Sequence, residues 1–368
     1  MLPSVAGGIG HISRTSALAR ALLRLEPGIE VEFVLDTDRL RPFNIEATAR
    51  MGFPPTLLPR LNRGNRESIV RAIFGGADVI VDDAARYLLP LKLLVPEAAW
   101  VSIAMHPVAD ELFLDWPLLV QMDAIIWPYV PLVGVPPELD IVKDKLVHTG
   151  PFLEVEDVPP KGKARVELGL PVDDPLVVYA PRGFPFGPEF GHRVLGAVYG
   201  AAETLRRSGH PGLRLVLLAV ADPNDLKDVP GVPDNLPDWV RVEGVVTPAQ
   251  SLLYTRSADI LIGEGTSTVH EGAALGTPLV LVEAPIQEAL LLAVRMGQQG
   301  AAHVFALPSV DAESFAGAFR AIMDRPGERE AMTVRASALV QSGGGAEAAA
   351  RLILEVAKRS GSPVSANG

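Results

Sequence analysis

The residue near the N-terminus best suited to catalysis is a histidine that follows a cluster of glycines. A short apolar stretch leads into the run Gly7-Gly8-Ile9-Gly10-His11, and a segment with helical periodicity comes next. Glycines at such a turn let the backbone bend sharply and a ligand approach closely. Histidine, with an ordinary pKa of about 6.5, can act as a general base at neutral pH. His11 is therefore our candidate catalytic residue and Gly10 a candidate phosphate contact, with a histidine that merely packs against the turn as an equal alternative.

The same run is also an incomplete dinucleotide-binding fingerprint. That fingerprint requires a third glycine, and this chain has Ser13 at that position. An acid that would suit a ribose does follow at Asp36. A dinucleotide site is therefore a weaker interpretation of the loop.

The second stretch with chemical potential runs from Gly263 to Gly276. An apolar run, Ile260-Leu261-Ile262, leads into glycines and hydroxyl residues, and we expect a helix from Thr268 to Leu275. Backbone N–H groups and hydroxyls at a helix start suit a diphosphate without many positive charges. Glu271 can accept hydrogen bonds from two ribose hydroxyls, unless it forms a capping box with Thr268. The candidate nucleotide-binding residues here are Gly265, Thr266, Ser267, Thr268 and Glu271.

Other candidate residues follow neighbouring expected strands. Backbone groups of Val245 and Val246 could contact a base edge, and Gln287 and Glu288 could bind sugar hydroxyls. For each of the latter two, a solvated helix start is an equally open interpretation. Two residues after the strand 176–180 could offset phosphate charge, or simply lie at the surface; they are Arg182 and Gly183.

Strand-like apolar runs alternate with helical periodicity through the whole chain. This alternation is typical of parallel α/β units. The proline-rich stretch 148–160 lacks any period and is the expected linker. We therefore predict an α/β protein with two doubly wound, Rossmann-like domains, residues 1–150 and 151–342, facing each other across a cleft. Residues 343–368 should form a helix that crosses back to the first domain, followed by a disordered tail.

Composition excludes several classes of site and partner. The chain of 368 residues has no cysteine, which rules out disulfides, thiolate metal sites and cysteine nucleophiles. Its net charge is −11 and no basic cluster appears, so a nucleic-acid partner is not expected. No apolar run reaches the length of a transmembrane helix, and no secretory signal is apparent. We expect a cytoplasmic protein.

The first domain contains further candidate residues. Asp83 and His106 end neighbouring strands and are candidates to orient His11 or contact a substrate. Phe113 and Trp116 lie in an apolar, aromatic segment that suits a partly hydrophobic molecule, although core packing is the simpler interpretation.

Together the two loops resemble the GT-B superfamily of glycosyltransferases, and most closely the peptidoglycan N-acetylglucosaminyltransferase and related UDP-glycosyltransferases. The resemblance rests on Gly8-x-Gly10-His11 and on the segment from Gly265 to Val282. In that family the acid matched by Glu271 binds the ribose, a backbone amide near Val245 or Val246 pairs with the base, and the residue matched by Gln287 recognises the sugar. Glu264 departs from the pattern, because an additional carboxylate beside phosphates is unfavourable unless it points away.

The resemblance implies transfer of a sugar from a UDP-sugar or dTDP-sugar to a small acceptor, with His11 as base. Helix dipoles would stabilise the departing diphosphate, so neither a cofactor nor a metal is expected. A nucleotide-sugar hydrolase or epimerase is an alternative, because the run Gly8–Arg14 also resembles the UDP-sugar hydrolase of pseudaminic acid synthesis. An inactive nucleotide-binding partner protein is a further alternative. The choice between UDP and dTDP, and the oligomeric state, stay open.

Overall fold

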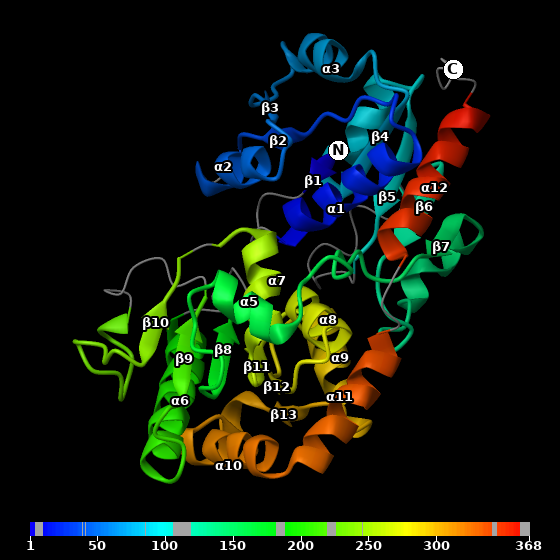
Figure 1. Ribbon diagram of the computed structural model, residues 1–368. Coiled ribbons are helices and arrows are strands. Elements are labelled where there is room, and N and C mark those ends of the chain that lie inside the picture. The colour runs from blue at the N-terminus through cyan, green and yellow to red at the C-terminus, as the bar shows by residue number, and fades with distance from the viewer. Residues whose placement is uncertain are drawn as a thin grey trace. The chain divides into compact units, whose positions relative to one another are not determined.

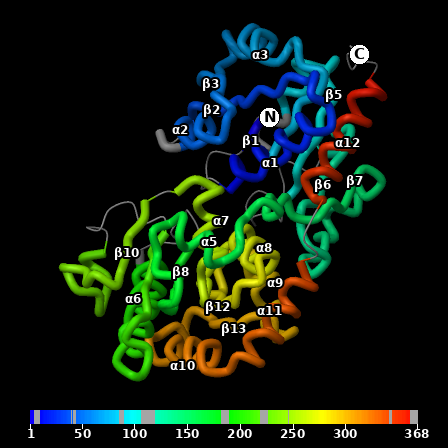
Figure 2. The backbone as a smooth tube through the Cα atoms, in the orientation of Figure 1, coloured from blue at the N-terminus to red at the C-terminus, as the bar shows by residue number. Residues whose placement is uncertain are grey.

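A computed structural model describes residues 1–3, 10–38, 40, 42–84, 86–105, 119–181, 188–218, 226–244, 246–340 and 344–360. The chain divides into two compact units (Figures 1 and 2). Unit 1 comprises residues 1–153 together with 343–368, and unit 2 comprises residues 154–342. No helix among the described residues is long and apolar enough to span a bilayer.

Unit 1 is built on the parallel strands β1 (Leu2–Pro3), β2 (Val34–Asp36), β3 (Thr56–Leu58), β4 (Val79–Asp83), β5 (Ala99–Ile103), β6 (Ala124–Trp127) and β7 (Leu146–His148). Five of them form a sheet in the order β1-β4-β5-β6-β7. The β2–β3 pair lies beside β1, because the Val34 N–H donates to the Met1 carbonyl at 2.9 Å. The strand order therefore reverses between β1 and β4, which is the switch point of a doubly wound sheet.

The helices of unit 1 are α1 (Gly10–Leu25), α2 (Pro42–Arg50), α3 (Arg66–Phe74) and α12 (Gly345–Arg359), with the 3-10 helices η1 (Arg86–Leu94) and η2 (Pro137–Lys145). One apolar cluster joins α1, the central strands and α12 through residues such as Leu18, Val101 and Ile353. Figure 1 shows α12, in red, alongside α1. The first residue of α12, Gly345, lies so close to the segment after β7 that a Cβ atom there would overlap the carbonyl oxygens of Gly150 and Pro151. The last helix is thus part of the core of unit 1.

Unit 2 repeats the same architecture with the parallel strands β8 (Leu176–Ala180), β9 (Arg214–Leu217), β10 (Val240–Val242), β11 (Ile260–Gly263), β12 (Leu279–Val282) and β13 (His303–Phe305). Their order is β10-β9-β8-β11-β12-β13, so the reversal falls between β8 and β11. The helices are α5 (Lys161–Glu167), α6 (Pro188–Arg207), α7 (Pro248–Ser257), α8 (Thr266–Ala274), α9 (Gln287–Gln298), α10 (Ala312–Asp324) and α11 (Pro326–Val340), with the 3-10 helix η4 (Leu307–Ser309).

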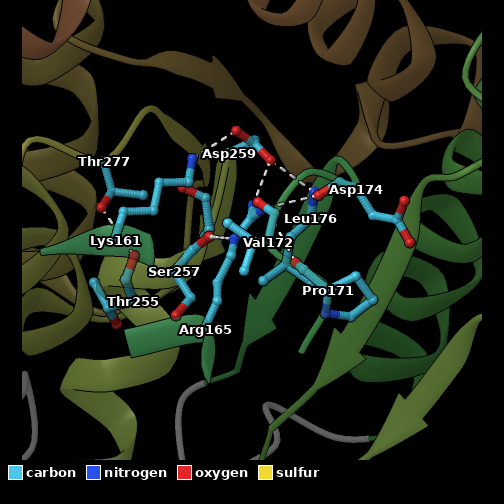
Figure 3. A network of polar contacts seen from close by, with 11 residues as sticks. Lys161, Arg165, Pro171, Val172, Asp174, Leu176, Thr255, Ser257, Asp259 and Thr277 are labelled. Carbon is cyan, nitrogen blue, oxygen red and sulfur yellow. Dashed lines mark hydrogen bonds and ion pairs between the residues drawn. The ribbon is translucent and has the colours of Figure 1, made fainter. Parts of the chain in front are cut away.

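A buried polar network fixes the amino ends of β8 and β11 (Figure 3). Asp259, just before β11, accepts hydrogen bonds from the Leu176 N–H at 2.8 Å and from Arg165 Nη2 at 2.7 Å. Arg165 is only 2% exposed and also donates through Nε to the Ser257 carbonyl at 2.9 Å. These bonds hold the two central strands in register at the edge opposite the strands' carboxyl ends. Open α/β sheets bind ligands at the carboxyl ends of their strands, and this network lies at the other end.

The predicted fold class is confirmed: both units are doubly wound α/β sheets. The sequence missed several short elements, among them β3 and the helices α2, α3, α5 and α7. Strands and helices this short carry too few residues for a clear period.

Candidate active site

His11 and Asp83 lie at the switch point of unit 1. His11 is the second residue of α1, which follows β1 in the chain, and Asp83 is the last residue of β4. Because β1 and β4 are neighbours in the sheet, their carboxyl ends meet at one edge. The fold thus joins two residues that are far apart in sequence at the position where ligands bind in such sheets.

Three side chains form a tight polar cluster at this edge. His11 Nδ1 lies 3.2 Å from Asp83 Oδ1, and Arg14 Nε donates to Asp83 Oδ2 at 3.0 Å. Arg14 Nη2 donates to Asp83 Oδ1. The Asp83 side chain is fully buried, whereas those of His11 and Arg14 are each 18% exposed. The cluster therefore presents a partly exposed imidazole on a buried carboxylate.

His11 Nδ1 contacts two charged groups. It lies 3.2 Å from Asp83 Oδ1, to which a protonated Nδ1 donates, and 3.1 Å from Arg14 Nη2, from which a bare Nδ1 accepts. In the tautomer with the proton on Nδ1, Nε2 keeps the lone pair that can accept a proton from a substrate. A carboxylate selects this tautomer in histidine-based acyl-transfer sites.

Electrostatics keep Asp83 charged despite its burial. Burial by itself raises the pKa of this carboxyl group, but Arg14 and His11 outweigh burial and lower the pKa below its ordinary value. For Arg14, burial by itself lowers the pKa, but Asp83 and Tyr129 together raise it above its ordinary value. The next residue, Ala84, has a φ of 56°, a left-handed conformation that is uncommon for alanine. Strain of this kind is often found at functional sites.

In unit 2, the start of α8 lies at the carboxyl end of β11, beside the β8–β11 switch point. The N-cap is Gly265, with φ −114° and ψ 158°, and no side chain caps the helix. The first-turn N–H groups belong to Thr266, Ser267 and Thr268, and an α-helix leaves such groups without internal partners. They form a site suited to a phosphate.

Two expectations about this helix were wrong. It begins at Thr266 and not at Thr268, because the extended backbone of Gly265 allows the first turn to follow β11 almost at once. With Gly265 as N-cap, Thr268 lies within the first turn and cannot form a capping box with Glu271. That explanation for Glu271 is excluded.

Glu271 lies on α8 as a partly buried acid. Among the described residues, none forms a hydrogen bond with its carboxylate. Burial raises the pKa of this group from 4.5 to about 7. Hydrogen bonds from hydroxyl groups, such as those of a ribose, would stabilise the charged form of this carboxylate.

The unexpected Glu264 is held by a tyrosine of the neighbouring strand. Its side chain is buried, and it accepts a hydrogen bond from the Tyr179 hydroxyl. Burial, together with the charge of Glu264, raises the pKa of Tyr179 well above its ordinary value, so the hydroxyl keeps its proton. The additional carboxylate therefore has a protein donor at the β8–β11 junction.

The remaining sequence candidates differ in how the structure places them. Gln287 is exposed at the start of α9, whereas Glu288 is 3% exposed, so a solvated helix start is wrong for Glu288. Val246 is partly buried between β10 and α7. Six candidates lie outside the described residues: His106, Phe113, Trp116, Arg182, Gly183 and Val245.

Sequence reasoning missed Arg14 and Tyr179 as members of the two sites. Arg14 follows His11 by three residues, a spacing that places both side chains on one face of a helix. That signal was available in the sequence. Tyr179 has no comparable local signal, because its partner Glu264 lies 85 residues away.

Comparison with known proteins identifies the same architecture elsewhere. No protein-family model matches the chain. Residues of this chain are 32% identical over 126 positions to the UDP-N-acetylglucosamine–N-acetylmuramyl-(pentapeptide) pyrophosphoryl-undecaprenol N-acetylglucosamine transferase of Rhodococcus opacus. That match covers 34% of this chain and 29% of the relative, so the chain spans less than a third of the relative's length.

Many solved structures match this chain in fold, and two of them illustrate the match over nearly its whole length. One is a putative UDP-N-acetylglucosamine 2-epimerase from Listeria monocytogenes, with a TM-score of 0.67, 13% identity and coverage of 98% of this chain and 96% of that one. The other is MurG of Acinetobacter baumannii, with a TM-score of 0.59, 15% identity and coverage of 95% and 97%. The chain therefore has the two-domain GT-B fold, with sequence similarity over a third of its length to an N-acetylglucosamine transferase.

Proposed function

We propose that this protein is a glycosyltransferase that moves a sugar from a UDP-sugar or dTDP-sugar to a small acceptor. The observation that carries the proposal is the paired His11 and Asp83 at the switch point of unit 1. The uncapped α8 start and the free carboxylate of Glu271 in unit 2 add a site suited to a nucleoside diphosphate. Unit 1 would then bind the acceptor and unit 2 the donor.

In the proposed reaction His11 is the base. Its Nε2 accepts the proton of an acceptor hydroxyl as that oxygen forms a bond to the anomeric carbon of the sugar. The bond from this carbon to the diphosphate breaks, and its electron pair leaves with the diphosphate. Asp83 stabilises the imidazolium that forms, while the first-turn N–H groups of α8 stabilise the growing charge on the diphosphate. With these donors in place, the reaction needs no metal ion.

A second candidate function is hydrolysis or epimerisation of a nucleotide-sugar. Its support is the likeness in fold to a protein described as a UDP-N-acetylglucosamine 2-epimerase. The His11–Asp83 pair would also activate water. The sequence similarity to a transferase favours transfer over this alternative.

Incubation with UDP-sugars and dTDP-sugars, with and without candidate acceptors, tests the proposal. We expect little loss of donor without an acceptor, and His11→Ala to lower turnover by about 10²–10⁴-fold, the usual range for a general base. Nucleotide affinity, measured by calorimetry, should stay nearly unchanged in His11→Ala. Rapid stoichiometric release of sugar without an acceptor would establish the hydrolase instead. Full turnover in His11→Ala would remove His11 from the mechanism.

A further inference from the structure

A pocket of about 350 Å³ lies at the carboxyl ends of β2 and β3 in unit 1. Its lining includes Asp36, the last residue of β2, and Leu58, the last residue of β3. Leu91 of η1 adds a further apolar wall. The volume is at the lower end of the range for small-molecule sites and suits one ring with a substituent.

Asp36 is a buried acid, and its two carboxylate oxygens differ in their hydrogen bonding to the described residues. Its side chain is 7% exposed, and Oδ1 accepts the Asp38 N–H at 3.1 Å. No described residue donates to Oδ2. An acid at the end of the second strand of a doubly wound sheet is placed to accept ring hydroxyls, as in dinucleotide-binding folds. Leu61, a partly exposed residue of the lining, provides a surface for the apolar face of such a ring, and Leu58 and Leu91 are buried beside the pocket.

Two arginines on the rim lack acidic partners. Arg63 and Arg66 line the pocket, and within the described part of the chain neither forms an ion pair. Within their loop, Asn62 Oδ1 accepts hydrogen bonds from the N–H groups of Gly64 at 2.9 Å and Asn65 at 3.1 Å. The other acid on the rim, Asp38, lies 3.9 Å from Arg60. The two free guanidinium groups therefore favour an anion.

We infer that this pocket binds a hydroxylated ring that carries an anionic substituent. Asp36 accepts hydrogen bonds from ring hydroxyls, Leu61 contacts the ring, and Arg63 and Arg66 pair with a phosphate or carboxylate. Binding at this pocket does not depend on the donor site of unit 2. That the bound ring is the sugar acceptor rests on the proposed transferase function.

Calorimetric titration of the full chain with glucose 6-phosphate and with glucuronate tests the inference. We expect the phosphate or carboxylate form to bind, with affinity falling at high salt because surface charges are screened. Asp36→Asn and the double variant Arg63→Gln/Arg66→Gln should each weaken binding about tenfold or more, as expected for lost charged hydrogen bonds. Glu271→Gln is the matched control, which should keep this ligand while losing affinity for UDP. A cooperative unfolding transition with the enthalpy of the wild type would show that unit 1 of both variants, which contains the pocket, is folded.

Titrations with glucose and with inorganic phosphate test the hydroxyl-binding and the anion-binding parts of the site separately. If phosphate binds as tightly as glucose 6-phosphate and Asp36→Asn has no effect, the pocket is only an anion site and the inference is wrong. If glucose alone binds as tightly, the role of the arginines is wrong. No binding of either anionic sugar at millimolar concentration also overturns the inference. Because these are binding measurements, failure of the transferase proposal would leave them intact and be seen separately as absent turnover with every donor.

Discussion

At the scale of single residues, the most informative contact is the one between Arg14 and Asp83. The arginine donates to both carboxylate oxygens, one bond from Nε and one from Nη2. Burial alone would raise the pKa of Asp83, so the charge that orients His11 depends on this guanidinium. Arg14 is thus a positioning residue for the proposed base, both through Asp83 and through its Nη2, which lies 3.1 Å from His11 Nδ1.

Arg14→Gln should lower kcat by about 10–100-fold, because it leaves a buried carboxylate without its main partner. Without Arg14 the pKa of Asp83 rises, so the acid limb of the pH–rate profile should move to higher pH. Arg14→Lys keeps the positive charge but not both hydrogen bonds, so its kcat should fall between those of the wild type and Arg14→Gln. Arg24→Gln, an exposed change on the same helix, is the control. An unchanged pH profile in Arg14→Gln would contradict this role.

Glu271 should make nucleotide binding depend on pH. Its pKa is raised by burial to about 7, so the carboxylate proposed to accept two ribose hydroxyls forms only as pH rises through that value. Nucleotide affinity should therefore increase through pH 7. Stability should change in the opposite sense: an acid with a raised pKa favours the folded state when protonated, and this contribution is lost as pH rises from 4.5 through 7.

Calorimetric affinities for UDP over a pH series, for the wild type and Glu271→Gln, check this prediction. The UDP phosphate titrates in the same range, so the variant is the necessary reference. Glu271→Gln should bind about tenfold more weakly above pH 7 and lack the part of the pH dependence due to this carboxyl group. Identical pH curves for both proteins would exclude Glu271 from the ribose site.

At the scale of elements, α8 is held directly against its own sheet. A Cβ on Gly272 would lie 2.7 Å from side-chain atoms of both Leu261 and Leu279. The helix therefore packs so closely over β11 and β12 that only glycine fits at this position. A Cβ on Gly263 would lie 3.1 Å from Thr268. This packing fixes the first turn of α8 just beyond the end of β11, where its free N–H groups can contact a ligand.

A proline at the first position of α8 tests those N–H groups. Thr266→Pro removes one N–H, but the helix should persist, because proline is favoured at this position and Gly265 already has the extended backbone that proline requires. UDP affinity should fall about tenfold or more, the effect of one charged hydrogen bond. Thr266→Ala, which removes only the hydroxyl, is the control. Unaltered UDP affinity in Thr266→Pro, with unaltered melting temperature, would place the diphosphate elsewhere.

At the scale of the whole molecule, each unit has its own sheet and its own apolar core. A ligand that binds only the native form of one unit stabilises that unit against unfolding. For the proposed donor, that unit is unit 2.

UDP or dTDP should therefore raise the melting temperature, by several degrees at a concentration about 100-fold above Kd. Differential scanning calorimetry in the presence of EDTA measures this shift. It should persist in EDTA, since the proposed phosphate donors are backbone N–H groups. His11→Ala should keep the shift and Glu271→Gln should reduce it. No shift at millimolar nucleotide would contradict the donor site.

The sequence by itself determined the α/β class, the two-unit plan and the helix start at the end of β11. Alternating strand and helix periods report which faces of a segment are buried, and glycines with hydroxyl residues report a helix start. One local signal went unused: the Thr247–Gln250 capping box that begins α7 is readable as a four-residue pattern. Much of the fold, and most of the candidate residues, were accessible at this level.

Tertiary structure alone decided which residues meet. Asp83 reaches His11 across 72 positions because β4 pairs with β1, and Tyr179 reaches Glu264 across 85 because β8 pairs with β11. Asp36 and Arg63 line one pocket for a similar reason, since β2 and β3 end at the same sheet edge. Periodicity encodes the burial of each segment but not its neighbours. Strand order is set by the packing of the whole sheet, and it is strand order that gives His11 its carboxylate.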